Sequence, residues 1–568
     1  MIFKSQLPKL DFPDIDIPTY CFTQAKINYA MAKNKTEFAL CDANTNTTFD
    51  VEEVQAKSVG FASGLVNKLG FKRDDVVAIY TPNSIYYPVA VYGTLMVGGI
   101  VTLANPSYTP RELAFQLKDS NAKAVVTQSE LAEATREAIK ISKLNIPDEN
   151  IIIIDIKAPN SRNIRSAHIH IENFYSNLPF DVYKITSKAE AENKIAVLPY
   201  SSGTTGLPKG VMLTHKNIVS NIIMNSCFAV NDEWIDRSRI APKFIGVLPF
   251  YHIYGFVSIL NLGISMSIGL VIMPKFDSDK FLEIIQKHRI TFGHIVPPII
   301  MGLINNPNIG NYDISSMRAI RTASAPMGQK ALTKFYSIFK NIGVVRAYGL
   351  TETSPTLCNS YKDHANDGSS GVLLHNLEAK VIDLDGNLLG YNQTGELCFR
   401  GSSIMKGYLN NPEANVRSID KDGFFHTGDV GYVDEQNNFF VIDRIKELIK
   451  YKGFQVAPAE LESLLLSHPD IADCAVIGIY IEDQATEIPK AFVTLTSANS
   501  SLSGQEKKAK TAAIISWLNS KVAPHKKLRG GMEILDTIPK STAGKILKNV
   551  LKSNEKAKRE LSNLKPNL

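Results

Sequence analysis

Residues 195–210 read IAVLPYSSGTTGLPKG, an apolar run that passes directly into a loop rich in glycine and hydroxyl groups. The backbone N–H groups and hydroxyls of such a loop are hydrogen-bond donors, and Lys209 adds a positive charge, so the loop suits a polyphosphate. The Walker A spacing, Gly-x4-Gly-Lys-Ser/Thr, does not occur here. Because Gly, Ser and Thr also cluster in ordinary polar turns, the assignment depends on what the rest of the chain contains.

The chain around this loop alternates between apolar, β-rich runs and helical patterns from residue 50 to about residue 350. Runs such as VVAIY at 76–80 are typical of strands buried on both faces of a parallel sheet. After Glu378, short strands separated by turns predict an antiparallel, barrel-like subdomain. Beyond residue 443 a compact α+β unit follows. The predicted fold class is α/β: a large N-terminal domain (1–443) of two α/β subdomains plus a small β-barrel-like subdomain, then a small α+β C-terminal domain (444–568).

Composition narrows the function classes. The net charge of +6 is spread over 62 basic and 56 acidic residues, so a nucleic-acid partner is not expected. The six cysteines form no CxxC pair, which argues against structural zinc and against a disulfide framework. Two long stretches without Asp, Glu, Lys or Arg, 76–110 and 244–274, are interrupted by turns and polar residues, and no integral membrane span is expected.

Further motifs follow the loop in a fixed order. They are Tyr348-Gly349-Leu350-Thr351-Glu352-Thr353, Gly395-Glu396-Leu397 with Arg400-Gly401, His426-Thr427-Gly428-Asp429, DRIKELIKYKGFQ at 443–455 and PKSTAGK at 539–545. Together with the loop they resemble the acyl-adenylate-forming superfamily, which includes acyl-CoA synthetases, 4-coumarate–CoA ligases, luciferases and peptide-synthetase adenylation domains. The resemblance runs from about residue 50 to about residue 550. It implies an ATP-dependent carboxylic acid–CoA ligase that first makes an acyl adenylate and then an acyl-CoA.

The resemblance also assigns residues to the adenylation step, which must neutralise clustered negative charge. Lys545 would reach the acyl carboxylate and the α-phosphate, Thr351 the α-phosphate, and Asp429 the ribose hydroxyls. Tyr348 would stack on adenine, and Glu352 would ligate Mg²⁺. The β- and γ-phosphates would be held by Ser201, Ser202, Gly203, Thr204, Thr205 and Lys209. Taken singly, each of these has an ordinary structural interpretation, such as a surface lysine or a turn carboxylate.

The second step requires the thiol of coenzyme A to reach the adenylate. By resemblance, the C-terminal domain is mobile, the hinge lies at 443–446 with Lys446 in it, and Arg444 binds the ribose. Lys450 and Gln455 would face the adenylate after the domain turns. Contacts to coenzyme A are assigned to Lys275, Lys452 and Gly453.

The acid pocket is less clearly specified. The family's histidine beside the acyl carboxylate matches His252, and Tyr254, Ser324, Arg346 and Ala347 are expected to line the pocket. Ala323 stands where relatives commonly have glycine, and Arg346-Ala347 stand where they often have Gln-Gly. The expected substrate is an aromatic, phenylpropanoid-like acid or a medium-chain acid.

Two alternatives remain open at this point. The acceptor is a carrier protein or oxygen instead of coenzyme A, or the protein is a catalytically silent binding homologue. The expected partners are otherwise a small carboxylic acid, ATP and coenzyme A, in a monomer or weak oligomer. The chain ends Lys565-Pro566-Asn567-Leu568 instead of Ser-Lys-Leu, so both a cytoplasmic and a peroxisomal location are expected to be compatible with it.

Overall fold

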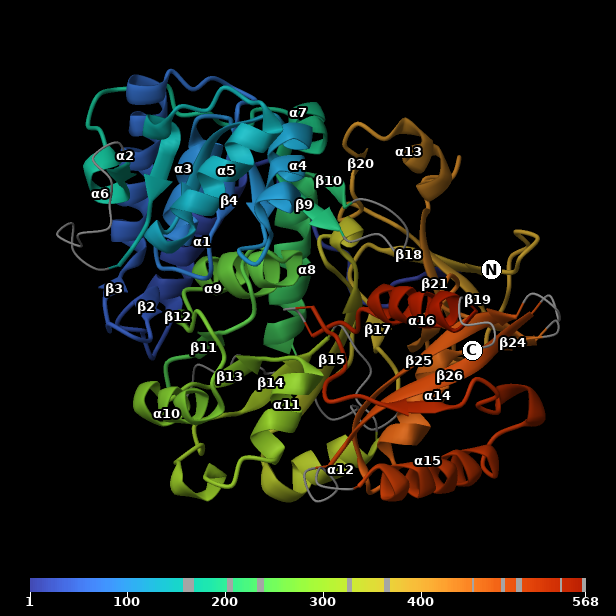
Figure 1. The fold of residues 1–568 in the computed structure, drawn as a ribbon. Helices are drawn as coiled ribbons and strands as arrows, with labels where there is room; N and C mark the ends of the chain where they lie inside the picture. The colour runs from blue at the N-terminus through green and yellow to red at the C-terminus, as the bar shows by residue number, and fades with distance from the viewer. Residues whose placement is uncertain are drawn as a thin grey trace.

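The computed structural model (Figure 1) describes residues 1–156, 168–201, 208–231, 240–323, 329–361, 368–451, 454–481, 486–496, 503–541 and 544–563. Over this part of the chain the architecture is α/β, with two large, mainly parallel sheets, an antiparallel sheet and a smaller C-terminal unit. The predicted α/β class and the antiparallel strands after Glu378 are therefore confirmed.

The first large sheet carries the polar loop of 195–210 at its edge. Its strand order is β20 (Gly407–Tyr408), β10 (Lys209–Thr214), β9 (Ile195–Ser201), β5 (Ile100–Ala104), β4 (Val76–Tyr80), β6 (Ala122–Thr127), β7 (Ile151–Ile153) and β8 (Ile169–His170). The strands from β9 to β8 are parallel, whereas β10 runs antiparallel to β9 and β20 antiparallel to β10. All five residues of β4 and of β5 are buried, as expected for strands covered on both faces.

The second large sheet packs against the first through a shared core. Its order is β17 (Val372–Leu373), β16 (Thr356–Asn359), β15 (Gly343–Gly349), β14 (Ala319–Thr322), β13 (Phe292–His294), β11 (Lys243–Gly246), β12 (Gly269–Ile272), β2 (Leu40–Asp42) and β3 (Thr48–Phe49). One hydrophobic core contains side chains from both sheets and from the helices between them. In Figure 1, helix α8 (His215–Asn231) runs between the blue and cyan sheet and the green one.

The two uncharged stretches of the sequence form buried crossover segments. Helix α3 (Tyr87–Met96) is buried at every position, and so are a π-helical segment, η3 (Gly255–Asn261), and the helix α9 (Leu262–Ser265) that continues it. A helix surrounded by protein needs no polar face, which explains the missing charges. Among the described residues, no helix combines the length and the apolar character needed to cross a bilayer.

The remaining helices of the large domain cover the sheets. They are α1 (Ile17–Met31), α2 (Val51–Leu69), α4 (Pro110–Ser120), α5 (Ala132–Ser142), α6 (Ile171–Phe174), α7 (Lys188–Asn193), α10 (Ser278–His288), α11 (Pro297–Ile304), α12 (Gln329–Ile338) and α13 (Pro412–Ser418). Two of them begin with a capping box, in which the side chain before the helix and a glutamate three residues later each bind the other's backbone N–H. The pairs are Asp50 with Glu53 in α2, and Thr109 with Glu112 in α4.

The antiparallel sheet forms after Glu378, as predicted, but its edge comes from elsewhere. Its order is β1 (Ile2–Lys4), β18 (Glu378–Ile382), β19 (Gly395–Arg400), β21 (Phe425–Val433) and β22 (Phe439–Arg444). The N-terminal strand β1 pairs with β18 over three residues. A run that short carries little periodic signal, so its pairing was not predictable from the sequence.

In its described residues, the C-terminal unit contains a hairpin, a small sheet, three α-helices and the short 3-10 helix η9 (Pro524–Lys526). They are β23 (Ile449–Tyr451), β24 (Phe454–Val456), α14 (Pro458–Leu466), β25 (Ile471–Ile481), β26 (Thr486–Leu495), α15 (Gly504–Asn519), β27 (Met532–Ile534) and α16 (Lys548–Asn563). This unit has hydrophobic clusters of its own, which supports its description as a separate domain. In Figure 1 it lies beside the gold antiparallel sheet, with α16 facing the large domain.

Candidate active site

The phosphate-loop motif begins and ends on paired strands. Ser201, at the end of β9, lies opposite Lys209, the first residue of β10, in the antiparallel register. The intervening residues 202–207 lie outside the described residues. The ammonium of Lys209 sits 4.8 Å from the centre of the Tyr408 ring, on the neighbouring strand β20. The hydroxyl of Tyr408 donates to Oε1 of Glu352 at 3.0 Å.

Glu352 lies on the short 3-10 turn η5 (Thr351–Thr353), directly after β15. Its side chain is nearly buried, at 8% exposure. Thr351 begins the same turn. The two parts of the sequence that were predicted to hold phosphate and metal therefore meet at Tyr408.

The predicted ribose residues Asp429 and Arg444 lie on the antiparallel sheet, and the predicted adenine residue Tyr348, on β15, contacts Asp429. The hydroxyl of Tyr348 donates to Oδ2 of Asp429 at 2.7 Å, and Nε of Arg444 lies 3.1 Å from Oδ1. Asp429 and Arg444 also face one another in the register of β21 and β22. Burial raises the pKa of Asp429 above its ordinary value, and Arg444 and Tyr348 act in the opposite direction.

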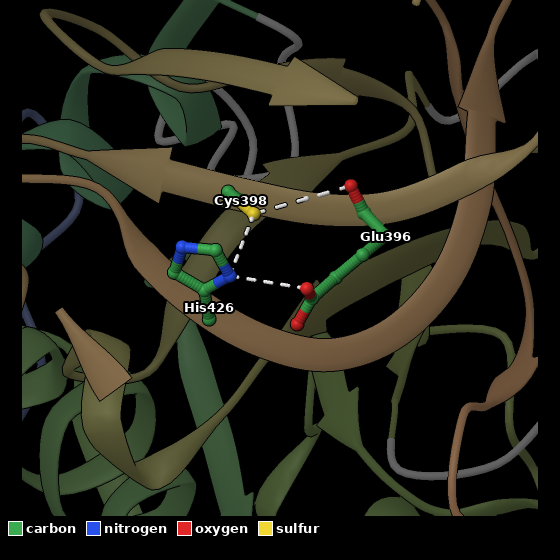
Figure 2. Close-up of side chains that lie close together, drawn as sticks. All are labelled: Glu396, Cys398 and His426. Atoms are coloured by element: carbon green, nitrogen blue, oxygen red, sulfur yellow. Dashed lines mark hydrogen bonds and ion pairs between the residues drawn. The ribbon is translucent and has the colours of Figure 1, made fainter. Parts of the chain in front are cut away.

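The residues around Asp429 are held by the third predicted motif. Nδ1 of His426 lies 3.0 Å from Oε2 of Glu396, and the other oxygen of Glu396 accepts the N–H of Gly428 at 3.0 Å. Figure 2 shows Glu396 and His426 facing each other beside Cys398. Gly428 adopts φ +69°, a conformation that favours glycine. Glu396 thus fixes the turn that precedes Asp429, the predicted ribose carboxylate.

The trio in Figure 2 has ligand types that a metal ion accepts, since its Glu, Cys and His atoms lie within 4.8 Å of one another. A thiol binds a metal as the thiolate. Burial, followed by the charge of Glu396, raises the pKa of the Cys398 thiol well above its usual range. The carboxylate of Glu396 raises the pKa of His426, which favours the imidazolium, a form that cannot ligate. We therefore interpret the trio as a structural hydrogen-bond network.

Lys545 reaches these groups from the C-terminal unit. It lies just before α16, and its N–H donates to Oγ of Ser541 at 3.1 Å. Burial and the charge of Arg444 lower the pKa of its ammonium, while Glu447, Asp429 and Glu352 act to raise it. The charges of Asp429 and Glu352 thus act on Lys545 across the boundary between the two predicted domains.

The predicted acyl-site histidine lies close to Lys545. Burial, with the charge of Lys545 as the second cause, lowers the pKa of His252 to about 4. His252 is therefore neutral near pH 7 and offers a hydrogen bond without a charge. Nearby, the hydroxyl of Tyr254 is 2.8 Å from Nδ1 of His294, and both side chains are buried. A fully buried Arg321 lies over the Tyr254 ring, 5.5 Å from its centre.

Strand β15 carries two further predicted pocket residues. Arg346 and Ala347 are both half-buried on it, and the N–H of Arg346 donates to Oγ of Ser360 at 2.8 Å. Arg346 pairs in register with Thr322 of β14, next to Ala323. Ala323 thus directly follows the strand that pairs with the one carrying Arg346 and Ala347.

The segment predicted to be the hinge is anchored on its C-terminal side. Asp443 accepts the N–H of Ala459, in the first turn of α14, at 2.9 Å. Lys548 of α16 pairs with Glu447 at 3.3 Å and with Glu462 of α14 at 2.9 Å. These contacts link the segment at 443–447 to the helix that follows Lys545.

Other predicted residues are not brought to this region. Lys446, Lys450 and Lys275 have exposed side chains, and Lys450 lies on hairpin β23–β24, where its N–H donates to Glu487. Gln455 is in β24, but its side chain is outside the described residues. Also outside them are Ser202, Gly203, Thr204, Thr205, Ser324, Lys452 and Gly453.

Two residues of this region, Tyr408 and Arg321, were not predicted from the sequence. Tyr408 follows Gly407 in the segment KGYLNNP, and apart from this Gly-Tyr pair the segment contains no feature that indicates a functional residue. Arg321 was also missed, because a strand read as apolar gives no reason to expect a buried guanidinium. Both were detectable only once the strands were placed side by side.

The fold and the site together define a two-domain nucleotide-binding enzyme. The model of the AMP-binding enzyme family matches residues 27–409, and that of the AMP-binding enzyme C-terminal domain matches residues 460–545. The chain belongs to the AMP-binding enzyme family.

Relatives match over nearly the whole length. The chain is 37% identical to 4-coumarate–CoA ligase 1 of Solanum tuberosum over 565 residues, which cover 97% of this chain and 96% of the relative. It is 35% identical to 4-coumarate–CoA ligase of Vanilla planifolia over 560 residues, with the same coverage.

Solved structures agree with the fold. ATP-bound MatB from Rhodopseudomonas palustris is 25% identical with a TM-score of 0.77, over 94% of this chain and 99% of MatB. The anthranilate–CoA ligase AuaEII, in complex with anthranoyl-AMP, is 21% identical with a TM-score of 0.79, over 98% and 99%.

Proposed function

We propose that this protein joins a carboxylic acid to coenzyme A with ATP, through an enzyme-bound acyl adenylate. The observation that carries the proposal is the position of Lys545, whose charge acts on His252 and which itself interacts with the carboxylates of Asp429 and Glu352 in the other domain. Such convergence of a cation, a neutral imidazole and two carboxylates suits the joining of a carboxylate to a nucleotide phosphate.

In the first step a carboxylate oxygen attacks the α-phosphorus of ATP, and pyrophosphate leaves. Lys545 would hold the carboxylate and an α-phosphate oxygen together and neutralise the charge that develops between them, with Thr351 as a further donor. His252, neutral because of its burial, would donate to the acid without competing for the charge of Lys545. Asp429 would accept the ribose hydroxyls, and Tyr348 would lie against the adenine.

The site also fits a magnesium ion. The carboxylate of Glu352 is a hard oxygen ligand in a nearly buried position, close to Lys209 through Tyr408. When bound there, the ion would supply positive charge to phosphate oxygens. Lys209, Ser201 and the loop residues 202–205 would bind the β- and γ-phosphates.

In the second step the thiolate of coenzyme A attacks the acyl carbon, and AMP leaves. We propose that the C-terminal domain turns about the segment 443–446, with Lys446 in it, to bring Lys450 and Gln455 toward the adenylate. Their hairpin lies apart from the site in the arrangement described here, which supports a division of labour between Lys545 and Lys450. Lys275, Lys452 and Gly453 are proposed to contact coenzyme A.

The substrate we propose is an aromatic acid. Relatives at 35–37% identity are named as 4-coumarate–CoA ligases. The aromatic ring of Tyr254 and the guanidinium groups of Arg321 and Arg346 offer this chain both an apolar wall and donors for a polar ring substituent. Medium-chain acids are the competing class.

The test is a panel of acids, including 4-coumarate and fatty acids of medium length. Pyrophosphate release and thioester formation are measured with and without coenzyme A. We expect both products with an aromatic acid. Pyrophosphate release without a thioester contradicts coenzyme A as the acceptor and favours a carrier protein or oxygen. A protein that binds ATP but turns over no acid is a silent homologue.

Two further properties are proposed with the function. We propose a monomer or weak oligomer, which light scattering at several concentrations tests. We propose a cytoplasmic or peroxisomal location, and fluorescence microscopy of the N-terminally tagged protein distinguishes the two.

A further inference from the structure

We propose that Tyr408 is a positioning residue that couples the metal carboxylate Glu352 to the phosphate lysine Lys209. The inference rests on the proposed function, which gives Glu352 and Lys209 their roles. Its own basis is that a single side chain contacts both groups, through its hydroxyl and through the face of its ring.

The first argument is the placement of β20, the two-residue strand that carries Tyr408. On one side it pairs with β10, whose first residue is Lys209, and the N–H of Leu409 donates to the carbonyl of Gly210 at 2.8 Å. On the other side the N–H of Met405 donates to the carbonyl of Glu352 at 2.8 Å. The backbone around Tyr408 thus bridges Glu352 and Gly210, the residue that follows Lys209.

The second argument is that the backbone N–H and the backbone carbonyl of Tyr408 are both held by hydrogen bonds. Its N–H donates to Oδ1 of Asn415 at 2.5 Å, and its carbonyl accepts from Nδ2 of the same residue at 3.0 Å. Asn415 belongs to α13. A Cβ on Gly407 would lie 3.0 Å from the Asn415 amide, so a side chain at position 407 would disturb the two hydrogen bonds between Asn415 and Tyr408. A tyrosine fixed in this way can fix its partners in turn.

The third argument is chemical. The side chains of Glu352 and Lys209 each have several rotatable bonds, so both lose conformational entropy when they are fixed to bind a ligand. A hydrogen bond to one carboxylate oxygen restricts the glutamate. The ring face attracts the ammonium without neutralising it, so that Lys209 keeps its charge for an anion.

The two contacts can be separated by substitution. Tyr408→Phe keeps the ring over Lys209 and removes the hydroxyl from Glu352, whereas Tyr408→Leu removes both. The matched control is Tyr391→Phe, which deletes an exposed tyrosine hydroxyl bound to Asn437 at 3.3 Å, far from both partners in the sequence. Thermal melting of each full-length variant reports on folding.

The measurement is calorimetric titration of ATP, without acid or coenzyme A, in EDTA and over a range of MgCl₂ concentrations. For Tyr408→Phe we expect affinity in EDTA within about twofold of the parent, and about a tenfold increase in the Mg²⁺ concentration that gives half of the full Mg²⁺ effect. For Tyr408→Leu we expect, in addition, about threefold to tenfold weaker binding in EDTA. Tyr391→Phe should match the parent.

Two results overturn the inference. One is a Tyr408→Phe protein whose Mg²⁺ dependence equals that of the parent; the other is equal loss by both variants in EDTA and in Mg²⁺, which indicates a purely structural role. Glu352→Gln separates this inference from the proposed function. If Glu352→Gln loses the Mg²⁺ effect and Tyr408→Phe retains it, only the role of Tyr408 fails. If the parent protein does not bind ATP, both fail.

Discussion

Replacing Lys545 by alanine is expected to remove the first half-reaction while leaving the second nearly intact. In the arrangement described here, Lys545 is mostly buried and interacts with His252, Asp429 and Glu352, whereas Lys450 is exposed on its hairpin. The proposed rotation exchanges the two lysines. A given lysine should therefore matter in one half-reaction only.

The size of the effect follows from the environment of the ammonium. A donor that is pre-positioned in a partly desolvated site contributes about 3–4 kcal/mol to the transition state, or about 100- to 1,000-fold in rate. The lowered pKa of Lys545 reflects desolvation, which strengthens its interactions. We expect Lys545→Ala to fall in that range for adenylation and to stay within about twofold for thioester formation.

The assay measures each half-reaction separately. Adenylation is followed by pyrophosphate release in single-turnover experiments, and thioester formation by supplying the acyl adenylate with coenzyme A. Lys540→Ala is the matched control, since Lys540 lies on the same segment but pairs with Asp473 at 2.6 Å. Equal loss in both half-reactions, or an equal effect of Lys540→Ala, would refute the reasoning.

Three further predictions concern other parts of the site and the core. Tyr348→Phe removes a donor from buried Asp429 and should raise the KM for ATP by about tenfold with a smaller change in kcat, as steady-state kinetics would show. Burial, and second the charge of Lys194, lower the pKa of His215 to about 3. The unfolded chain therefore binds a proton at His215 more readily than the folded chain does. The contribution of His215 to stability is thus present above about pH 6.5 and declines toward pH 3. Between pH 7 and pH 5, the free energy of unfolding measured in urea should therefore fall by about 2 kcal/mol less for His215→Gln than for the parent. Arg346→Gln should change the relative kcat/KM of the acids in the panel by about tenfold without changing the KM for ATP, and an unchanged ranking would remove Arg346 from the pocket.

The α/β character of the fold was predictable because its strands are buried on both faces. VVAIY at 76–80 and IVTLA at 100–104 are continuous apolar runs, and in the structure each forms a fully buried parallel strand. The same logic failed for Ile2–Lys4, whose pairing with β18 joins residues 376 positions apart. Pairing over such distances depends on the whole topology, which local periodicity does not encode.

The candidate site divides in the same way. Asp429, Glu352 and Lys545 were recognisable because each stands in a motif of several residues. Tyr408 was not, because its importance comes from what lies on the two adjacent segments. A sequence motif identifies groups that bind a ligand directly more readily than it identifies the side chains that support them.

The ion pair between Arg444 and Asp429 links nucleotide affinity to domain orientation. Arg444 ends β22, and the proposed hinge begins one residue earlier, so a rotation at 443–446 changes how its guanidinium meets the carboxylate. A ribose bound to Asp429 shares that carboxylate with Arg444. If the rotation changes the affinity for AMP by a given factor, thermodynamic linkage requires that bound AMP shift the equilibrium between the two orientations by the same factor. Release of AMP after the second step and return of the domain for the next cycle are then two views of a single equilibrium.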